Sequence, residues 1–362
     1  MFYHDPSLKS VNLLLLTRSF EQYGDPNGGS EYGYYGHAGL GVNAMHTVRV
    51  LRREHIQCNA TTVQTPASVM EAVEKYHPTH CLIEVPWLTS EELATICAKY
   101  PSVHFMVRSH SQIGFLQIEP STIKNLRDAL ILQEGVQNLT VAANSRRLAE
   151  FIRTAYQANC LYLPNLYDVE RTHRKRDENH DHRLLRVGLF GALRLQKNHT
   201  TGAAAAMIMA KERNADLEIY ISTGRGENSG KEKMNSVYNS LHEMTTGLDW
   251  LKLVEVKWSS WPEFRRTVSN MDIICQASMS ETFNIVTADA IAEGVPAVVS
   301  EAIEWAPRNW QAELDSTTDI ARTGSMLLSS YSEAHRGLEH LKHFLKHATH
   351  EWLEYLSSNP TL

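Results

Sequence analysis

Short apolar runs alternate with helical patterns along most of this 362-residue sequence. The runs are too apolar for half-exposed strands, which is typical of a parallel sheet covered by helices on both faces. They occupy residues 11–17, 56–63, 80–85, 103–108, 139–143, 160–163, 186–190, 217–222, 251–258, 272–275 and 297–300. The helical patterns occupy residues 39–54, 67–76, 90–100, 145–156, 199–211, 231–244, 262–269 and 284–293. The alternation predicts an α/β protein whose sheets are parallel.

A polar stretch that reads ERTHRKRDENHDHR separates two such alternating halves. It is dense in charge and lacks apolar periodicity, as expected for a linker. We therefore expect an N-terminal domain over residues 1–169, a linker over 170–184, a C-terminal domain over 185–330 and a long amphipathic helix within 331–362. Ligands of open parallel sheets bind at the carboxyl ends of the strands, so the site should lie in a cleft between the two halves.

The composition excludes several classes of protein. A hydrophobic fraction of 43% and a charged fraction of 21% are typical of globular proteins. The net charge of −6 argues against a purely electrostatic nucleic-acid binder. The apolar runs are far shorter than the ~20 residues of a membrane span, and no signal-peptide pattern is visible. Five cysteines without a CxxC pair favour a reducing compartment, so we expect a cytoplasmic protein.

The strongest motif is segment 280–300, SETFNIVTADAIAEGVPAVVS, which follows the predicted strand 272–275. Asn284, Ile285 and Val286 begin a predicted helix. A helix start presents unpaired amide N–H groups and a positive dipole end, so a pyrophosphate is its natural ligand. Glu281 and Asp289 would repel a phosphate and are instead suited to the sugar and ribose hydroxyls beside it.

This segment resembles the acidic signature of retaining nucleotide-sugar glycosyltransferases with the GT-B fold, of the group 1 or family 4 type. Glu281, Phe283 and residues 290–296 match the signature, whereas Asn284 replaces a glycine and Asp289 replaces a glutamate. The resemblance implies two Rossmann-like parallel-sheet domains that face a cleft, with a C-terminal helix that packs back across. It also implies an enzyme that transfers a sugar from a nucleotide-sugar donor to an acceptor with retention of the anomeric configuration.

A second segment, FGALRLQKN at residues 190–198, resembles the family's Gly-Arg-Leu-x-x-x-Lys-Gly loop. The resemblance implies that Gly191, Arg194 and Lys197 contact the donor pyrophosphate, although Ala192 stands where the family has its arginine. Positive side chains can stabilise a nucleoside diphosphate leaving group without a metal ion. We therefore expect no metal site and no cofactor besides a nucleotide-sugar co-substrate of the UDP or GDP type.

The first half carries weaker signals. Gly39 and Gly41 open its first predicted helix, where similar family members place a glycine-rich loop against the donor phosphates. His110 follows the predicted strand 103–108, where a family histidine approaches the transferred sugar. The resemblance thus gives His110, Glu281 and Lys197 as candidate catalytic residues.

The acceptor is open at this level: a sugar, a small molecule or DNA. A tyrosine-rich loop over residues 18–38 and arginines at 146–147, 171–176 and 265–266 could line a path for DNA, and a hydroxymethylated base would then be the acceptor. A nucleotide-sugar epimerase or a non-catalytic sugar-nucleotide binding module could be built on the same scaffold. Four histidines of the tail, at 340, 343, 347 and 350, fit an exposed helix face better than a metal site.

Overall fold

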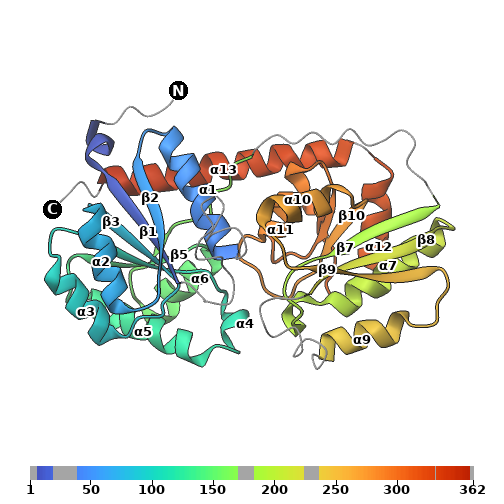
Figure 1. The fold of residues 1–362 in the computed structure, drawn as a ribbon, viewed down its shortest axis with the longest axis horizontal. Coiled ribbons are helices and arrows are strands. Elements are labelled where there is room, and N and C mark those ends of the chain that lie inside the picture. Colours follow the sequence, from blue (N-terminus) through green and yellow to red (C-terminus); the bar gives the residue numbers. More distant parts are fainter. Residues whose placement is uncertain (1–5, 19–38, 170–182, 224–235, 331, 359–362) are drawn as a thin grey trace. The chain divides into compact units, whose positions relative to one another are not determined.

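The computed structural model describes residues 6–18, 39–169, 183–223, 236–330 and 332–358. The chain divides into two compact units, each with its own sheet and helices (Figure 1). The first unit comprises residues 1–168 and 345–362, and the second comprises residues 169–344. The tyrosine-rich loop, except Arg18, and the arginines at 171–176 lie outside the described residues.

The first unit contains a six-stranded sheet with the order β2-β1-β3-β4-β5-β6. All its neighbouring strands are parallel. Its strands are β1 (Asn12–Arg18), β2 (Gln57–Val63), β3 (His80–Glu84), β4 (His104–Ser109), β5 (Leu139–Ala143) and β6 (Leu161–Tyr162). Strand β3 is buried at every position, because the sheet is covered on both faces.

The helices of the first unit connect consecutive strands. They are α1 (Gly39–Arg53), α2 (Pro66–Tyr76), α3 (Ser90–Lys99), α4 (Ile113–Leu116), α5 (Pro120–Gln133) and α6 (Arg146–Phe151), after a 3-10 turn at Pro6–Ser10. Thr65 and Thr89 begin α2 and α3 with capping boxes, which satisfy first-turn amides that the helix itself leaves unbonded.

Side chains alternate between the two faces along each strand of this sheet. Leu14 and Leu16 of β1 belong to a core that also contains residues of α2, α3, α5 and α6. His80 and His104 alternate with residues of that core and lie near Tyr355 of the C-terminal helix α13 (Ser332–Ser358). The end of α13 therefore covers the other face of the first sheet.

The second unit contains a five-stranded parallel sheet with the order β11-β10-β7-β8-β9. Its strands are β7 (Leu184–Leu189), β8 (Asp216–Thr223), β9 (Leu251–Lys257), β10 (Ile273–Gln276) and β11 (Ala297–Val299). Its helices are α7 (His199–Glu212), α9 (Ser236–Thr245), α10 (Trp261–Ser269), α11 (Ile285–Ala292) and α12 (Thr317–Leu328). Helix α7 contacts α9 and α12, whereas α10 contacts α11.

Helix α13 belongs to both units: its residues up to 344 group with the second unit and those from 345 with the first. Within the first unit, Trp352 is fully buried and its Nε1 donates to the Pro164 carbonyl at 2.8 Å. The tail histidines are exposed, as predicted, and the described residues contain no cluster of side chains that could hold a metal ion.

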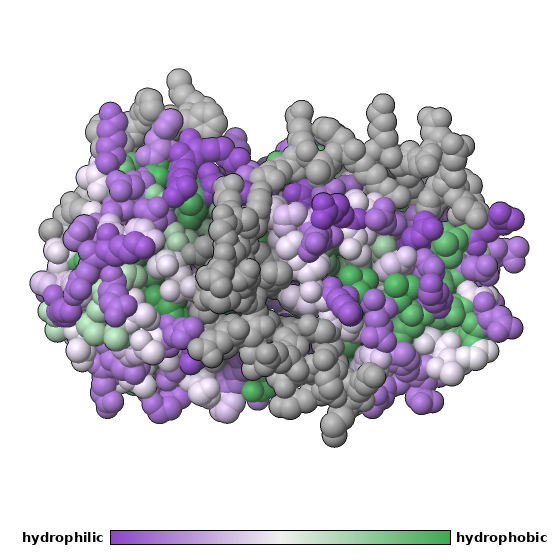
Figure 2. Space-filling model, viewed as in Figure 1, coloured by the Kyte–Doolittle hydropathy of each residue, from purple (hydrophilic) through white to green (hydrophobic). Residues whose placement is uncertain are grey.

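No helix in the described ranges is long and apolar enough to cross a membrane. Figure 2 shows hydrophilic residues spread over the visible surface of both units, with hydrophobic residues between them. All five cysteines are buried free thiols.

The predicted α/β fold is confirmed, and every predicted strand is present. Helices α4, α5 and α12 were not predicted, and the predicted helix 145–156 is α6 followed by a π-helical turn at Ile152–Tyr156. The predicted helix 231–244 corresponds to α9, and its first five residues lie outside the described ranges.

Candidate functional site

The predicted donor-binding loops meet at the point where the order of the second sheet reverses. Strand β7 lies between β10 and β8, and β10 lies between β11 and β7. Loops after two such neighbouring strands form the usual ligand site of an open parallel sheet. The loop after β7 carries Gly191, Arg194 and Lys197, and the loop after β10 carries Glu281. The two loops are joined by a hydrogen bond from the Met279 amide to the Gln196 carbonyl, at 2.8 Å.

Lys197 and Glu281 form an ion pair, 84 residues apart in the sequence. Their side chains are 11% and 12% exposed, so the pair is largely buried but keeps some contact with solvent. Gly191 has a φ of +112°, and a Cβ atom there would lie 3.4 Å from Lys197 Cε. Glycine is therefore required by the backbone conformation, whereas the contact of a Cβ atom with Lys197 would be an ordinary one.

Asn284 begins α11 with a left-handed backbone conformation, φ 58°. Its Oδ1 accepts from the Thr287 amide at 2.9 Å and from Thr287 Oγ1 at 3.0 Å. Its Nδ2 donates to Gln276 Oε1 at 2.9 Å, and Gln276 Nε2 donates to the Phe190 carbonyl at 2.9 Å. Asparagine tolerates positive φ better than most residues, which explains how it can replace the family's glycine. The side chain also fixes the start of α11 to the loop after β7.

The first amides of α11 are available to a ligand. Among the described residues, the backbone N–H groups of Asn284, Ile285 and Val286 have no hydrogen-bond acceptor, whereas that of Thr287 is capped. Unbonded amides at a helix start bind anions, and the helix dipole favours negative charge there. The helix start lies where the sequence predicted it, and its first amide belongs to the residue three positions after Glu281.

Two further residues of the acidic segment, Asp289 and Phe283, were also candidates for contact with the donor, and both are packed beneath this loop. Asp289 is 1% exposed, and its Oδ1 accepts from Trp261 Nε1 at 2.9 Å. Phe283 is 2% exposed, its ring stacks on Phe344, and its carbonyl accepts from Trp305 Nε1 at 2.6 Å. These contacts give Phe283 a packing role and orient the Asp289 carboxylate toward an indole, so a ribose contact by Asp289 stays a prediction.

Arg194 and Lys197 create a positive environment at the start of α7. His199, the first residue of α7, is 4% exposed. Burial lowers the pKa of His199 to about 3, and the charges of Lys197 and Arg194 act in the same direction. The imidazole is therefore neutral at physiological pH. His199 was not among the predicted site residues.

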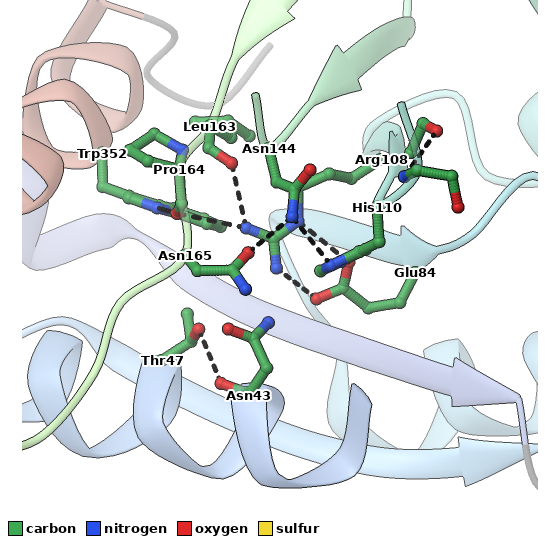
Figure 3. A network of polar contacts seen from close by, with 12 residues as sticks. Asn43, Thr47, Glu84, Arg108, His110, Asn144, Leu163, Pro164, Asn165 and Trp352 are labelled. Carbon is green, nitrogen blue, oxygen red and sulfur yellow. Dashed lines mark hydrogen bonds and ion pairs between the residues drawn. The ribbon is translucent and has the colours of Figure 1, made fainter. Parts of the chain in front are cut away.

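The first unit gathers polar side chains at the carboxyl ends of β3, β4 and β5 (Figure 3). Glu84 and Arg108 are fully buried and form a bidentate ion pair, with Arg108 Nε 2.9 Å from Glu84 Oε2. Arg108 Nη1 also donates to the carbonyls of Leu163 and Pro164, at 3.1 and 3.3 Å. The guanidinium lies over the ring of Trp352, 5.2 Å from its centroid. Every charge in this group is thus neutralised inside the unit.

His110 is held at both ring nitrogens. Nε2 lies 2.6 Å from Glu84 Oε2, and Nδ1 lies 3.2 Å from Asn144 Nδ2, which also donates to Asn165 Oδ1 at 3.0 Å. A carboxylate only accepts and an amide nitrogen only donates, so the neutral imidazole with its proton on Nε2 satisfies every contact. Burial, followed by the Arg108 charge, lowers the pKa of His110, although Glu84 opposes this shift. Burial would raise the pKa of Glu84, but Arg108 and His110 hold it at about 2.

Gly39 and Gly41 lie in the first turn of α1, as predicted. A Cβ atom at Gly39 would contact nothing within 4 Å. His110 and both glycines belong to the first unit, whereas the remaining candidates belong to the second.

The arginine clusters are partly committed to other contacts. Arg146 pairs with Glu351 at 3.0 Å and lies over the ring of Tyr162. Arg265 is 5% exposed and pairs with Glu293 at 2.6 Å. These two arginines therefore stabilise their own units, and nothing in their contacts indicates a path for DNA.

No family model and no curated protein matches the sequence. Several solved structures match it over almost its full length. Sucrose-phosphate synthase from Thermosynechococcus elongatus matches with a TM-score of 0.67 and 13% identity, over 95% of this chain and 98% of that chain. A trehalose-6-phosphate synthase studied for glycosyl transfer with retention matches with a TM-score of 0.62 and 9% identity, over 96% and 99%. The UDP-forming α,α-trehalose-phosphate synthase from Burkholderia xenovorans matches with a TM-score of 0.58 and 9% identity, over 96% and 97%.

The chain has the GT-B fold of nucleotide-sugar glycosyltransferases. The GT-B fold was predicted from segments 190–198 and 280–300, whose key side chains the structure brings together. The sequence did not single out Glu84, Asn144 or Gln276. Each stands at or directly after the end of a strand, and that position was the one signal that could have found them.

Proposed function

We propose that this GT-B protein is a glycosyltransferase that moves a sugar from a nucleoside-diphosphate sugar to an acceptor, with retention of the anomeric configuration. The proposal is carried by the ion pair of Lys197 with Glu281, which precedes a helix start whose first amides are unbonded among the described residues. An ammonium group and free amides are suited to a diphosphate. The adjacent carboxylate is suited to sugar hydroxyls.

The leaving group of such a reaction is a nucleoside diphosphate, which gains negative charge as the bond to the sugar breaks. In the proposed reaction Lys197 and Arg194 stabilise this charge, together with the amides of Asn284, Ile285 and Val286. A divalent metal ion is not required for this step. The donor is a sugar nucleotide of the UDP or GDP type, and the UDP-forming relative supports the former.

The remaining candidates take roles around the sugar and the ribose. Glu281 orients hydroxyls of the transferred sugar, and Asp289 binds the ribose after its hydrogen bond with Trp261 opens. From the first unit, Gly39 and Gly41 approach the donor phosphates and His110 acts on the transferred sugar. Retention is supported by the trehalose-6-phosphate synthase with a similar fold.

A sugar or small-molecule acceptor is favoured over a base in DNA, because Arg146 and Arg265 are engaged in ion pairs. A cytoplasmic location is supported by the five buried free thiols, since disulfides are rare in reducing compartments.

The test is a thermal-shift and calorimetric screen of UDP, GDP and their sugars, because a ligand that binds the native state raises its stability. Lys197→Met should weaken binding of the identified donor by about 10- to 100-fold, since charge-assisted hydrogen bonds contribute ~1.5–3 kcal/mol. Lys252→Met is the matched control: Lys252 lies near the amino end of β9, with its side chain 71% exposed. It should bind the donor as the wild type does.

Turnover separates a transferase from an epimerase and from a binding module. Donor hydrolysis that falls in both Lys197→Met and Glu281→Ala supports a transferase. An epimerised donor after incubation without acceptor would indicate an epimerase. Donor binding with background turnover that neither substitution changes would indicate a non-catalytic binding module.

A further inference from the structure

Asn43 of α1 carries a buried amide nitrogen that no neighbour satisfies. The residue is 3% exposed, and among the described residues its Nδ2 has no hydrogen-bond partner. A native protein rarely leaves such a donor unpaired, because burying it costs the hydrogen bonds it makes in water. An unpaired buried donor is therefore an indication of a ligand.

In Figure 3 the Asn43 side chain points from α1 toward Asn165, the residue that follows β6 and Pro164. Asn165 is 6% exposed, and its Oδ1 accepts from Asn144. We call Asn43, Asn144 and Asn165 the amide cluster. It lies at the carboxyl ends of the strands of the first sheet, next to His110, which is where open parallel sheets bind ligands.

The titratable groups drawn beside the amide cluster in Figure 3 are Glu84, Arg108 and His110, and together they carry no net charge. Glu84 and Arg108 neutralise each other and are fully buried, and the neutral His110 imidazole with its proton on Nε2 satisfies the hydrogen bonds with Glu84 and Asn144. A phosphate would gain no opposite charge from these groups. Amides, by contrast, match hydroxyl groups, because both donate and accept hydrogen bonds.

We infer that the amide cluster binds the acceptor of this enzyme, and that the acceptor is an uncharged polyhydroxylated molecule, a sugar or a polyol. Asn43 Nδ2 donates a hydrogen bond to one of its hydroxyl oxygens. This inference rests on the proposed sugar transfer and names the substrate class of its second substrate.

The decisive variant is Asn43→Leu, which keeps the size of the side chain and removes its amide. Since the amide nitrogen has no protein partner among the described residues, the variant should melt at the temperature of the wild type or above it. It should bind neutral sugars at least tenfold more weakly in calorimetric titrations with glucose, trehalose and glycerol. Asn43→Ala serves the same purpose if leucine disturbs the packing.

Asn59→Leu is the matched control. Asn59 lies on the edge strand β2, and its Oδ1 accepts from Arg52 at 3.0 Å in an exposed position. This variant should bind the sugars as the wild type does. A melting temperature that falls in Asn43→Leu while sugar binding stays within twofold of the wild type would overturn the inference, because it would show a purely structural amide.

Charge is tested with glucose 6-phosphate and with duplex DNA that contains a hydroxymethylated base. Tighter binding of either probe than of glucose by tenfold or more would overturn the neutral acceptor. All titrations are run without nucleotide, so they are independent of donor binding. If neutral sugars bind and require Asn43, but no nucleotide sugar binds, the amide cluster is supported as a sugar site and the proposed transfer is refuted. If a nucleotide sugar binds, but sugar binding does not depend on Asn43, the inference about the amide cluster is refuted and the proposed transfer is supported.

Discussion

The two units place charged side chains at the same end of their sheets, but in different states. In the second unit, Lys197 and Glu281 are each about one-tenth exposed, and the neighbouring helix start has amides that are unbonded among the described residues. In the first unit, Glu84 and Arg108 are fully buried, and His110 uses both ring nitrogens. The site of the second unit keeps unbonded amides that a ligand could use. In the first unit, the charged side chains are paired with one another.

The comparison distinguishes charges that are proposed to bind a ligand, in the second unit, from charges that stabilise the fold, in the first. A fully buried ion must be neutralised by partners inside the protein, because burial removes the hydration that stabilises its charge in water. Arg108 accordingly contacts Glu84, two carbonyls and the ring of Trp352. A partly exposed ion keeps some bound water, and a phosphate can replace that water. The same ion-pair chemistry therefore stabilises the first unit, and in the second it is proposed to bind the donor.

The largest expected effect comes from Arg108→Met, which leaves the Glu84 carboxylate buried without its partner. Breaking a buried pair on one side costs ~3–5 kcal/mol. We expect a loss of this size in the free energy of opening of β3, β4 and β5, measured by hydrogen exchange with mass spectrometry. Lys197→Met should change the protection of β7 and β10 by less than Arg108→Met changes that of β3, β4 and β5, because the Lys197–Glu281 pair keeps some contact with solvent and the Glu84–Arg108 pair keeps none.

The double variant Glu84→Gln with Arg108→Met provides the control. It removes both charges, so part of the lost stability should return. Equal losses of protection in Arg108→Met and Lys197→Met would contradict the contrast between the two sites.

Each unit also contains a neutral histidine, half-buried His104 in the first and buried His199 in the second, which predicts a pH dependence. Burial, followed by the electrostatic interaction with His80, lowers the pKa of His104 from 6.5 to about 4, and burial lowers the pKa of His199 in the second unit to about 3. The unfolded chain takes up a proton on each residue near pH 6.5, whereas the folded chain does not. The contribution of these two histidines to stability should therefore be constant above pH 7 and fall as the pH drops from 6.5 toward 4, by at most ~1.4 kcal/mol per pH unit for each histidine.

Urea titrations at pH 7.5 and 5.5 measure this loss. His104→Gln and His199→Gln should each reduce the difference between the two pH values. Hydrogen exchange should assign the first reduction to the first unit and the second to the second unit. Stability that rises on acidification would contradict the neutral state of both residues.

The fold could be predicted from the sequence because strand burial and helix period are local patterns. Helix α5 was missed although its residues Leu126, Ala129 and Leu130 are buried, because its apolar stripe is short and interrupted by charges. Lys197 and Glu281 were each singled out by the resemblance of two loops, but their ion pair was not predicted. The internal partners of Glu84 and His110 were not, because they depend on which strand ends become neighbours in space and on the depth of burial there.

The smallest predicted effect concerns Asn284, where the chain departs from the family's glycine. Asn284→Gly keeps the positive φ but loses the cap on Thr287 and the hydrogen bond to Gln276. We expect a loss of ~1 kcal/mol in the stability of α11, measured by hydrogen exchange. Donor affinity should stay within threefold of the wild type, because the amides that face the anion are unchanged and the Thr287 amide is released beside them. Asn284→Ala is the contrasting variant: it loses the same contacts and adds backbone strain at φ 58°, so it should cost ~1 kcal/mol more. A large loss of donor affinity in Asn284→Gly would mean that the side chain itself binds the donor, and the second site would then resemble the first in using amide side chains for recognition.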